Sequence, residues 1–365
     1  MTGMDLEAAL APYRERSNRE ILAVVEDYER GRDSADEPSL KTLDASRKLL
    51  AAGKRYRYAI ACLAYQALTG SEDFKAPARP AAWLELYHLY TLFLDDIMDE
   101  DDRRRTFPSA WSSNMKRYRG TDASRPGVAF RTARHRYGVS MALLDALRIR
   151  SLAERSIQGS THLDTSVRER LLEVLTDTDL RLSDGQGLDI DFETRPSLAE
   201  ADYERMGHLK TGVLYVAAAT TGAILADAPP NRTEALEEFA RRFSVAFQDR
   251  DDLLGSGVVA SRIGGSAEGD IRKGKRTRLY AITTARLPAA KRRAFLTAYG
   301  KGTRTTAKDV RLVRDLMREH ALDAMTTRIR ENVDHAISAL RSANPWGPPT
   351  SILESLALAQ LTRLN

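Results

Sequence analysis

Two short runs of acidic residues have the side-chain type and the spacing of metal ligands. The first run, LFLDDIMDEDDRRR at residues 92–105, places Asp95 and Asp99 four residues apart, so both carboxylates share one face of a helix, and Asp96 flanks them. Carboxylates so close together repel one another, and a bound cation would offset this repulsion. Magnesium prefers hard oxygen ligands and usually lies between one or two carboxylates and the phosphates of a substrate. The first run therefore predicts magnesium ligands that face a phosphorylated substrate.

A second run, FSVAFQDRDDLLG at residues 243–255, repeats this pattern on another expected helix. Gln248, Asp251 and Asp252 are three and four residues apart, so an amide and two carboxylates project from one side. A single run of this kind has a simpler explanation, a solvated helix end whose acids pair with the arginines that follow. Two helices that each end an apolar stretch with carboxylates favour a shared site, in which they would hold a metal-bound diphosphate from both sides.

Basic residues near these runs would supply the other half of a diphosphate site, because carboxylates alone repel an anion. GKRYR at residues 53–57 opens a helix, whose first backbone amides also favour phosphate. The other basic residues follow the two acidic runs or lie in KTG at residues 210–212. Each cation alone is an ordinary surface residue, but together they favour a diphosphate site. The residues are Lys54, Arg57, Arg104, Arg105, Lys210 and Lys275.

Helices must position these residues, because the sequence has apolar residues at three- and four-residue spacing and almost no alternating β-branched runs. We expect an all-α protein in which strands are hard to place. Two loops, at residues 103–126 and 255–270, directly follow the acidic runs and are placed to close over them as lids. The expected helices cover about 4–31, 54–69, 79–102, 127–157, 164–192, 198–226, 231–255, 276–302 and 305–341, with a short helix near the end.

The bulk composition disfavours several other classes of protein. The 365 residues are 42% hydrophobic and 29% charged, which is ordinary for a globular fold with a sizeable core. The formal charge of +5 suits anionic substrates, whereas nucleic acid is a poor fit because acidic residues are interspersed with the basic ones. No apolar run is long enough for a membrane span and the first residues do not resemble a signal peptide, so we expect a cytoplasmic protein. The single cysteine, Cys62, excludes an internal disulfide and a cysteine-based zinc site, and we expect it to be buried.

The order of these motifs resembles that of the trans-isoprenyl diphosphate synthases, the polyprenyl synthetase family. LDDIMDEDDRRR resembles the family's first motif, DDxxD followed by two arginines, and FQDRDDLLG resembles the second motif, FQxxDD. GKRYR, DGQGLD, KTG and GDIRKGKRT resemble four further signatures, so the match covers about residues 50–285 in the family's order. Asp249 stands where the family usually has an aliphatic residue, and Gly255 replaces the last aspartate of a full second motif. Tyr58, Leu94 and Gly265 also depart from the pattern, the last at a position where a lysine is usual.

The resemblance implies an all-α helical bundle around a deep central cavity, forming one domain over residues 1–365 with C-terminal helices over 303–365. It also implies a homodimer and three magnesium ions in each active site. Carried over position by position, Asp95, Asp96, Asp99, Asp251 and Asp252 would bind magnesium. Arg104, Lys210 and Lys275 would bind the allylic diphosphate, and Lys54, Arg57, His88 and Arg105 would bind isopentenyl diphosphate. The residues expected to act at the developing cation are Lys210, Thr211 and Gln248.

The implied reaction is the ionisation of an allylic diphosphate, with dimethylallyl, geranyl or farnesyl as the primer. The double bond of isopentenyl diphosphate then attacks the cation, and the loss of a proton completes a five-carbon extension. Tyr90 and Thr91 lie about one helical turn before Asp95, with Tyr87 a turn further, and we expect them to form the floor that limits chain length. An aromatic residue at the Tyr90 position is typical of short-chain synthases and favours geranylgeranyl diphosphate, although both tyrosines also suit ordinary core packing.

Three alternative functions stay open at this point. A farnesyl diphosphate synthase would share these motifs and differ only in its product. A class I terpene cyclase would share the ionisation chemistry, but its second motif resembles NSE or DTE patterns, unlike FQDRDD. A catalytically weak subunit of a heteromeric synthase would account for Leu94 and Gly265.

Overall fold

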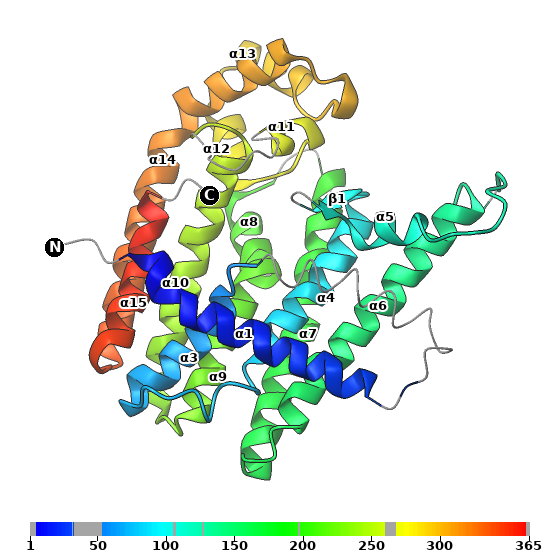
Figure 1. Cartoon of the computed structure of the whole chain (residues 1–365). Coiled ribbons are helices and arrows are strands. Elements are labelled where there is room, and N and C mark those ends of the chain that lie inside the picture. The colour runs from blue at the N-terminus through cyan, green and yellow to red at the C-terminus, as the bar shows by residue number, and fades with distance from the viewer. Residues whose placement is uncertain are drawn as a thin grey trace. The chain divides into compact units, whose positions relative to one another are not determined.

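The computed structural model describes residues 5–30, 32, 53–104, 107–125, 128–195, 198–259 and 268–362, and in this part of the chain nearly every regular element is a helix (Figure 1). The expected all-α fold class is thereby confirmed. The helices up to residue 194 are α1 (Leu6–Glu29), α3 (Tyr56–Thr69), α4 (Ala82–Met98), α5 (Ala110–Met115), α6 (Ala133–Gln158) and α7 (Thr165–Thr194). The later helices are α8 (Glu200–Gly207), the π-helix η2 (His208–Gly212), α9 (Val213–Leu225), α10 (Pro230–Gly255), α11 (Gly269–Lys273), α12 (Arg278–Arg286), α13 (Ala289–Ala298), the 3₁₀ turn η3 (Gly302–Arg304), α14 (Ala307–Ser342), α15 (Gly347–Leu358) and the 3₁₀ turn η4 (Ala359–Leu361).

The contacts between Cα atoms divide the chain into two compact units. The N-terminal unit comprises Glu7–Tyr65 and Ser71–Glu173, and the C-terminal unit comprises Met1–Leu6, Gln66–Gly70 and Val174–Asn365. The expectation of one domain around a central cavity stays a prediction. Asp95 lies in the N-terminal unit and Asp251 in the C-terminal unit, so each half of the predicted site is described in its own unit.

In the N-terminal unit, α4 packs along α6, and α5 packs on α6 as well. Trp83 and Tyr87 of α4 are completely buried, which places much of this largely apolar helix in the core. Gly138 lets α6 cross α5 closely, because a Cβ atom at this position would lie 2.7 Å from the carbonyl oxygen of Trp111. Asn114 of α5 then donates a hydrogen bond to the buried Asp145 of α6 (3.2 Å).

In the C-terminal unit, α10 packs along both α14 and α9, and α14 also contacts α12 and α13. An aromatic group joins α9 to α10: the ring of Tyr215 lies 5.2 Å from that of Phe243 and 5.6 Å from that of Phe247. Phe239 and Phe243 are fully buried. These contacts hold α10, which carries the second acidic run, within the apolar core of its unit.

Local sequence signals set the helix ends. Pro230 occupies the first turn of α10, where its missing N–H has no partner to lose. Thr306 and Asp309 form a reciprocal capping box at the start of α14. Thr277 caps α12 by accepting a hydrogen bond from the amide of Tyr280 (3.2 Å). The last of these caps fixes the segment that bears Lys275.

Several boundaries differ from the sequence-based expectation. The helix expected over 276–302 is two helices, α12 and α13, because Pro288 follows the extended Leu287 and cannot continue a helix. The loop expected over 103–126 contains α5 and two short antiparallel strands, β1 (Arg103–Arg104) and β2 (Phe107–Pro108). Arg105 and Gly265 lie outside the described residues, and the role of the two loops as lids stays a prediction.

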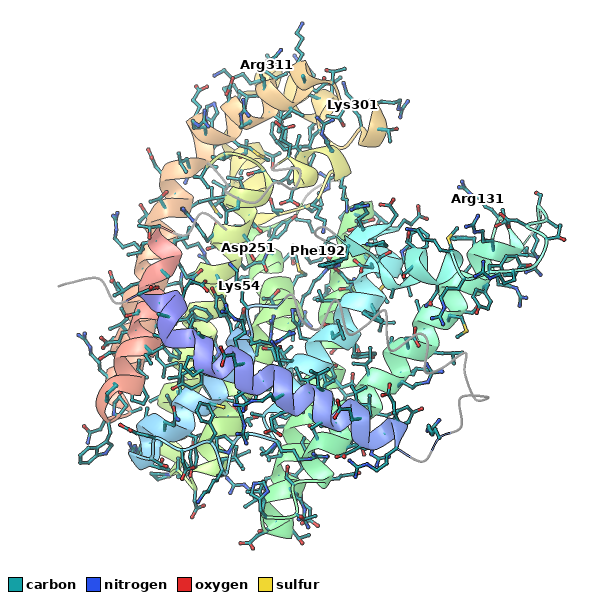
Figure 2. All side chains as sticks on the ribbon, in the orientation of Figure 1. Lys54, Arg131, Phe192, Asp251, Lys301 and Arg311 are labelled. Carbon is teal, nitrogen blue, oxygen red and sulfur yellow. The ribbon has the colours of Figure 1, made fainter. Side chains whose placement is uncertain are left out.

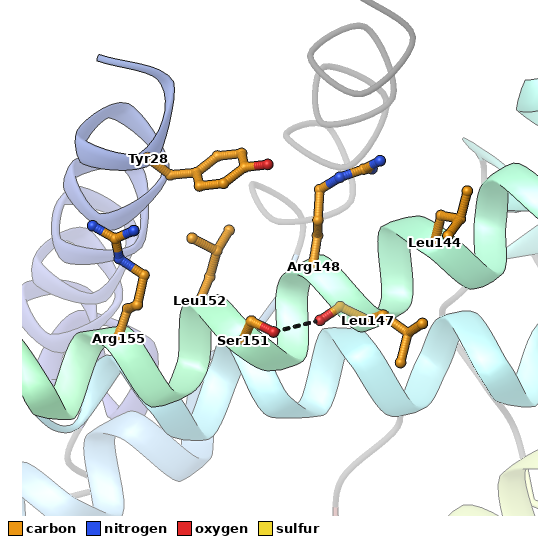
Figure 3. Close-up of a pocket in the computed structure, with 7 residues that line it drawn as sticks. All are labelled: Tyr28, Leu144, Leu147, Arg148, Ser151, Leu152 and Arg155. Carbon is orange, nitrogen blue, oxygen red and sulfur yellow. Dashed lines mark hydrogen bonds between the residues drawn. The ribbon is translucent and has the colours of Figure 1, made fainter. Parts of the chain in front are cut away.

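Within the described ranges, no helix is both long and apolar enough to cross a membrane. Cys62 is fully buried in α3, as expected. A pocket of about 380 Å³ lies beside α6 in the N-terminal unit, between Tyr28 of α1 and a row of side chains that includes Leu147 and Arg155 (Figure 3). The pocket contains none of the predicted site residues.

Candidate diphosphate and magnesium site

The first acidic run lies at the end of the buried helix α4, where Asp95 and Asp96 occupy the last turn and Asp99 is the C-cap. Phe93, two residues before Asp95, is 1% exposed and fixes the helix in the core. Asp96 is itself 1% exposed, whereas the Asp95 side chain is 18% exposed. The helix therefore brings one buried and one accessible carboxylate to the same place.

Arg104 joins these two carboxylates. Its Nη2 lies 2.8 Å from Oδ2 of Asp95, and its Nε donates to Oδ1 of Asp96 at 2.7 Å. The other oxygen of Asp96, Oδ2, is buried and has no hydrogen-bond partner within the described structure. Burial raises the pKa of Asp96 to about 6, although the hydrogen bond from Arg104 opposes this shift. A buried carboxylate oxygen without a partner is costly, and a cation would satisfy it.

The carboxylates of Asp95 and Asp96 suit magnesium, but they do not form a complete metal site by themselves. Among the described residues, no group of three or more His, Cys, Asp or Glu side chains is arranged to hold a metal ion. Magnesium usually takes one or two carboxylates and completes its shell with substrate phosphates and water. Asp95 and Asp96 match this need for few protein ligands, and Arg104 balances their charge in the structure described.

The segment GKRYR lies at the start of α3, where Arg55 has a positive φ of 59°. Arg55 is buried and forms an ion pair with Glu85 of α4 (3.4 Å). The same Glu85 accepts hydrogen bonds from the backbone amides of Arg57 (3.1 Å) and Tyr58 (3.2 Å). The expectation that the first amides of this helix favour phosphate is therefore wrong for these two, because a carboxylate of the protein already binds them.

The side chains of Lys54 and Arg57 stay candidates for isopentenyl diphosphate. Both are partly exposed, and Lys54 Nζ lies 5.6 Å from the centre of the Tyr56 ring. His88 is on α4, seven residues before Asp95, and is also partly exposed. Their part in binding stays a prediction, as does that of Arg105.

The residues of the predicted floor lie together on α4. Tyr87 is fully buried, and its ring lies 5.2 Å from the ring of Tyr90 in an edge-to-face arrangement. Tyr90 and Thr91 are partly exposed. The hydroxyl of Thr91 donates to the carbonyl oxygen of His88 (2.8 Å). This arrangement places two phenol rings in edge-to-face contact before the first acidic run.

The second acidic run forms the C-terminal part of α10 in the C-terminal unit, where Figure 2 labels Asp251. Asp251 is partly exposed, whereas Asp252 is 5% exposed. Asp252 accepts hydrogen bonds from the amide of Gln248 (3.0 Å) and from the backbone N–H of Arg278 (3.1 Å). Burial raises the pKa of Asp252 well above its usual range, and the negative charge of Asp249 adds to this shift. Asp251 is thus the more accessible carboxylate of the pair.

Lys210 and Thr211 lie in the π-helix η2, a wider turn than the α-helix that is often found at functional sites. The hydroxyl of Thr211 donates to Oε1 of Gln248 (3.1 Å), which joins two of the three predicted catalytic residues. Lys210 Nζ lies 2.5 Å from Oδ2 of Asp189 on α7. Gly185 lets the backbone of η2 approach α7 closely, since a Cβ atom at Gly185 would lie 2.4 Å from the backbone nitrogen of Lys210.

Lys275 lies in the turn between α11 and α12. Gly274 has a left-handed φ of 75°, which suits glycine. The backbone of Lys275 is held at both ends: its N–H donates to the carbonyl oxygen of Asp270 (3.0 Å), and its carbonyl accepts the hydroxyl of Tyr299 (2.5 Å). This turn therefore presents Lys275 from a fixed backbone.

Gly255, the departure in the second motif, has a direct structural explanation. A Cβ atom at this position would lie 2.2 Å from Oδ2 of Asp270. The carboxyl group of Asp270 thus occupies the space next to the Gly255 backbone into which an aspartate side chain would project.

The sequence motifs did not assign a role to three residues that the structure places in contact with the predicted site. Asp189 pairs with Lys210, Glu85 binds the start of α3, and Arg278 binds the second acidic run. Asp189 could have been found, because it is the aspartate of the segment that resembles GQxxD. No local pattern marks Glu85 or Arg278, whose partners lie 28 and 26 residues away in the chain.

The chain has clear relatives. The family model of the polyprenyl synthetases matches residues 41–317. A geranylgeranyl diphosphate synthase of Methanosarcina mazei is 32% identical over 280 residues, which is 76% of this chain and 76% of the relative. A geranylgeranyl diphosphate synthase of Sulfolobus acidocaldarius is 27% identical over 330 residues, covering 89% of this chain and 91% of the relative.

Solved structures share the fold. The crystal structure of a geranylgeranyl pyrophosphate synthetase from Pyrococcus horikoshii is 26% identical, covers 98% of both chains and gives a TM-score of 0.80. A geranylgeranyl pyrophosphate synthase from Corynebacterium glutamicum, complexed with isoprenyl diphosphate and magnesium, gives a TM-score of 0.83 over 99% of this chain and 100% of that one, at 24% identity. The family predicted from the sequence is confirmed: this chain belongs to the polyprenyl synthetases, the trans-isoprenyl diphosphate synthases.

Proposed function

We propose that this protein is a short-chain trans-prenyltransferase that adds isopentenyl diphosphate to an allylic diphosphate and forms geranylgeranyl diphosphate. The observation that carries the proposal is the group at the end of α4. There the buried Asp96, with an oxygen that lacks a partner, and the accessible Asp95 share the cation Arg104. Such a group suits the binding of a magnesium diphosphate.

Each predicted residue has a role in this proposal. Magnesium, when bound, would neutralise the diphosphate and make it a better leaving group. Asp95, Asp96 and Asp99 would bind the magnesium from the end of α4, and Asp251 and Asp252 would bind it from α10. Lys210, Lys275 and Arg104 would bind the allylic diphosphate, while Lys54, Arg57, His88 and Arg105 would bind isopentenyl diphosphate. Three magnesium ions would be needed in each site.

The hydrogen-bonded pair Thr211 and Gln248 would act where positive charge develops on the allylic carbon. Oxygen atoms fixed in advance stabilise such a charge without reorganisation during the reaction. Their 3.1 Å hydrogen bond and the attachment of Gln248 to Asp252 support this role, because both keep the oxygens in place. Lys210 would act beside them on the departing diphosphate.

The proposed product is the twenty-carbon diphosphate. The edge-to-face rings of Tyr87 and Tyr90 support a floor that stops elongation early. The names of the relatives in Methanosarcina mazei and Sulfolobus acidocaldarius agree with this product. Geranylfarnesyl diphosphate synthases are also among the relatives, for example one of Natronomonas pharaonis at 32% identity over 293 residues, so product length needs a direct assay.

We further propose a cytoplasmic homodimer. On α6, Leu143, Leu144 and Leu147 are 40%, 48% and 58% exposed, and clustered exposed leucines are typical of a protein interface. Sedimentation of the purified protein at several concentrations would test this proposal, and a monomer at all of them would contradict it.

The deciding experiment incubates the purified protein with magnesium, labelled isopentenyl diphosphate and each allylic primer in turn. We expect extension to geranylgeranyl diphosphate, and none when both Asp95 and Asp251 are replaced by asparagine. A hydrocarbon formed without isopentenyl diphosphate would instead indicate a cyclase. Activity that needs a second protein would indicate a subunit of a heteromeric enzyme, and farnesyl diphosphate as the end product would correct the product length.

A further inference from the structure

One residue of the second acidic run, Asp249, forms a buried ion pair that the proposed reaction does not use. Nε of Arg278, the first residue of α12, donates to Oδ1 of Asp249 on α10 at 2.9 Å. The two side chains are 7% and 2% exposed. Burying two charges is expensive, and a pair of apolar residues would often be no less stable at such a place. The pair therefore calls for a reason other than stability.

Arg278 binds the acidic run in a second way, through its backbone. Its N–H lies in the first turn of α12, where backbone amides have no partner within the helix. It donates to Oδ2 of Asp252 (3.1 Å). Asp249 and Asp252 lie three residues apart on one face of α10, so one residue of α12 holds both. From Asp252 the hydrogen bonds continue to Gln248 and then to Thr211.

The same contacts determine where Lys275 lies. Lys275 is three residues before Arg278, and the N–H of Thr277 donates to its carbonyl oxygen (2.9 Å). Because Arg278 fixes the first turn of α12 on α10, the backbone of Lys275 is fixed with respect to Asp249 and Asp252. The side chain of Arg278 is thus a connection between a predicted diphosphate ligand and the second acidic run.

Other charged groups surround the pair but do not belong to α12. Nε of Arg328, on α14, lies 3.2 Å from Oδ2 of Asp249, and Arg328 also pairs with Glu204 (3.1 Å). Glu200 of α8 lies near both arginines, 3.4 Å from Arg278 and 3.6 Å from Arg328. Arg328 therefore neutralises Asp249 as Arg278 does, but it has no direct link to Lys275. This difference allows a matched control.

We infer that Arg278 and Asp249 are positioning residues for the allylic diphosphate. Their ion pair holds the turn of Lys275 at the distance from α10 at which Lys275 and Asp251 bind the same diphosphate. The inference rests on the proposed function, because it assumes that Lys275 is a diphosphate ligand. Loss of the pair should weaken binding of the allylic substrate and leave binding of isopentenyl diphosphate unchanged, since its predicted ligands lie in the N-terminal unit.

The test compares Arg278→Met, Arg278→Lys, the double variant Asp249→Leu/Arg278→Met, and Arg328→Met as the matched control. The double variant removes both charges and preserves packing, so it should fold even if Arg278→Met does not. For the double variant we expect KM for the allylic diphosphate to rise about tenfold and KM for isopentenyl diphosphate to change less than about twofold. Arg278→Lys keeps a cation near Asp249 and should recover most of the loss. Arg328→Met should lower thermal stability without changing either KM.

A second readout does not depend on catalysis. Calorimetry with magnesium and inorganic diphosphate should show weaker binding for the double variant than for wild type or Arg328→Met. If wild type binds diphosphate but does not extend a primer, the proposed function fails while the positioning role can still be judged. An unchanged allylic KM and unchanged diphosphate affinity in a folded double variant would overturn the inference. An equal effect of Arg328→Met would also overturn it, because a general loss of charge would then explain both.

Discussion

Lys210 and Asp189 form an ion pair with 2.5 Å between Nζ and Oδ2, which links η2 to α7. The pair holds a predicted diphosphate ligand in a defined position before any substrate binds. Asp189→Asn should therefore lower kcat/KM for the allylic substrate by about tenfold, because Lys210 would lose the partner that orients it. Steady-state kinetics would measure the change. Asp191→Asn, which removes the exposed pair of Asp191 on α7 with Arg195 just after that helix, is the control and should have almost no effect.

Arg104 should compete with metal ions for the first acidic run. Replacing Arg104 by methionine removes a cation that pairs with Asp95 and Asp96, so the affinity for Mn²⁺ in the absence of diphosphate should rise about fivefold to tenfold. The allylic KM should rise as well, because the same arginine is a predicted diphosphate ligand. Electron paramagnetic resonance of free Mn²⁺ would measure the affinity. Arg103→Met serves as the control, and an equal Mn²⁺ affinity in Arg104→Met and wild type would contradict the prediction.

Asp96 should make folding stability depend on pH. Its pKa is raised from 3.8 to about 6, mainly by burial, so the folded state holds its proton more tightly than the unfolded state. The stability that this proton provides is fully present below pH 3.8 and is lost as the pH rises through about 6. At pH 8 without magnesium, Asp96→Asn should be more stable than wild type by at most about 3 kcal/mol, and the difference should vanish near pH 4. Urea unfolding in EDTA would measure it, with the exposed Asp323→Asn as the control, and a constant difference would refute it.

The floor of the predicted cavity should respond to the size of Tyr90. Tyr90→Ala removes one of two rings in edge-to-face contact, and Tyr87→Ala removes the other, so each should allow longer products and the double variant the longest. Chromatography of the dephosphorylated products would show their length. Tyr28→Ala on α1 should leave the product unchanged, and identical products from all variants would show that these tyrosines only pack the core.

Restoring the family's aspartate at Gly255 should harm the protein, not improve it. A side chain there would meet the Asp270 carboxyl group, which lies 2.2 Å from the position of the new Cβ atom. We expect Gly255→Asp to lower kcat by about tenfold or more, because two carboxylates would be forced together beside Asp251. The double variant Gly255→Asp/Asp270→Gly should recover part of the loss. An increase in activity of the single variant would contradict this expectation.

The sequence predicted the fold class and the family well, because helical periodicity and ordered motifs are local signals. Asp95, Asp96 and Asp251 were named from their spacing alone. The sequence did not predict the ion pair of Asp189 with Lys210 or of Asp249 with Arg278, since each joins helices far apart in the chain. It did not predict the left-handed Arg55 either, whose buried side chain pairs with Glu85. Such contacts depend on tertiary packing, which no pattern within one segment encodes.

The hydrogen bonds that Glu85 accepts from the start of α3 restrict how this helix can move. Glu85 lies on α4, the same helix as His88, Asp95 and Asp96. It accepts hydrogen bonds from the backbone amides of Arg57 and Tyr58. The segment that carries Lys54 therefore cannot move away from α4 without breaking two hydrogen bonds, one of them buried and the other partly buried. We expect α3 and α4 to move together as one rigid body during turnover. Any hinge in the N-terminal unit would then lie outside this pair of helices.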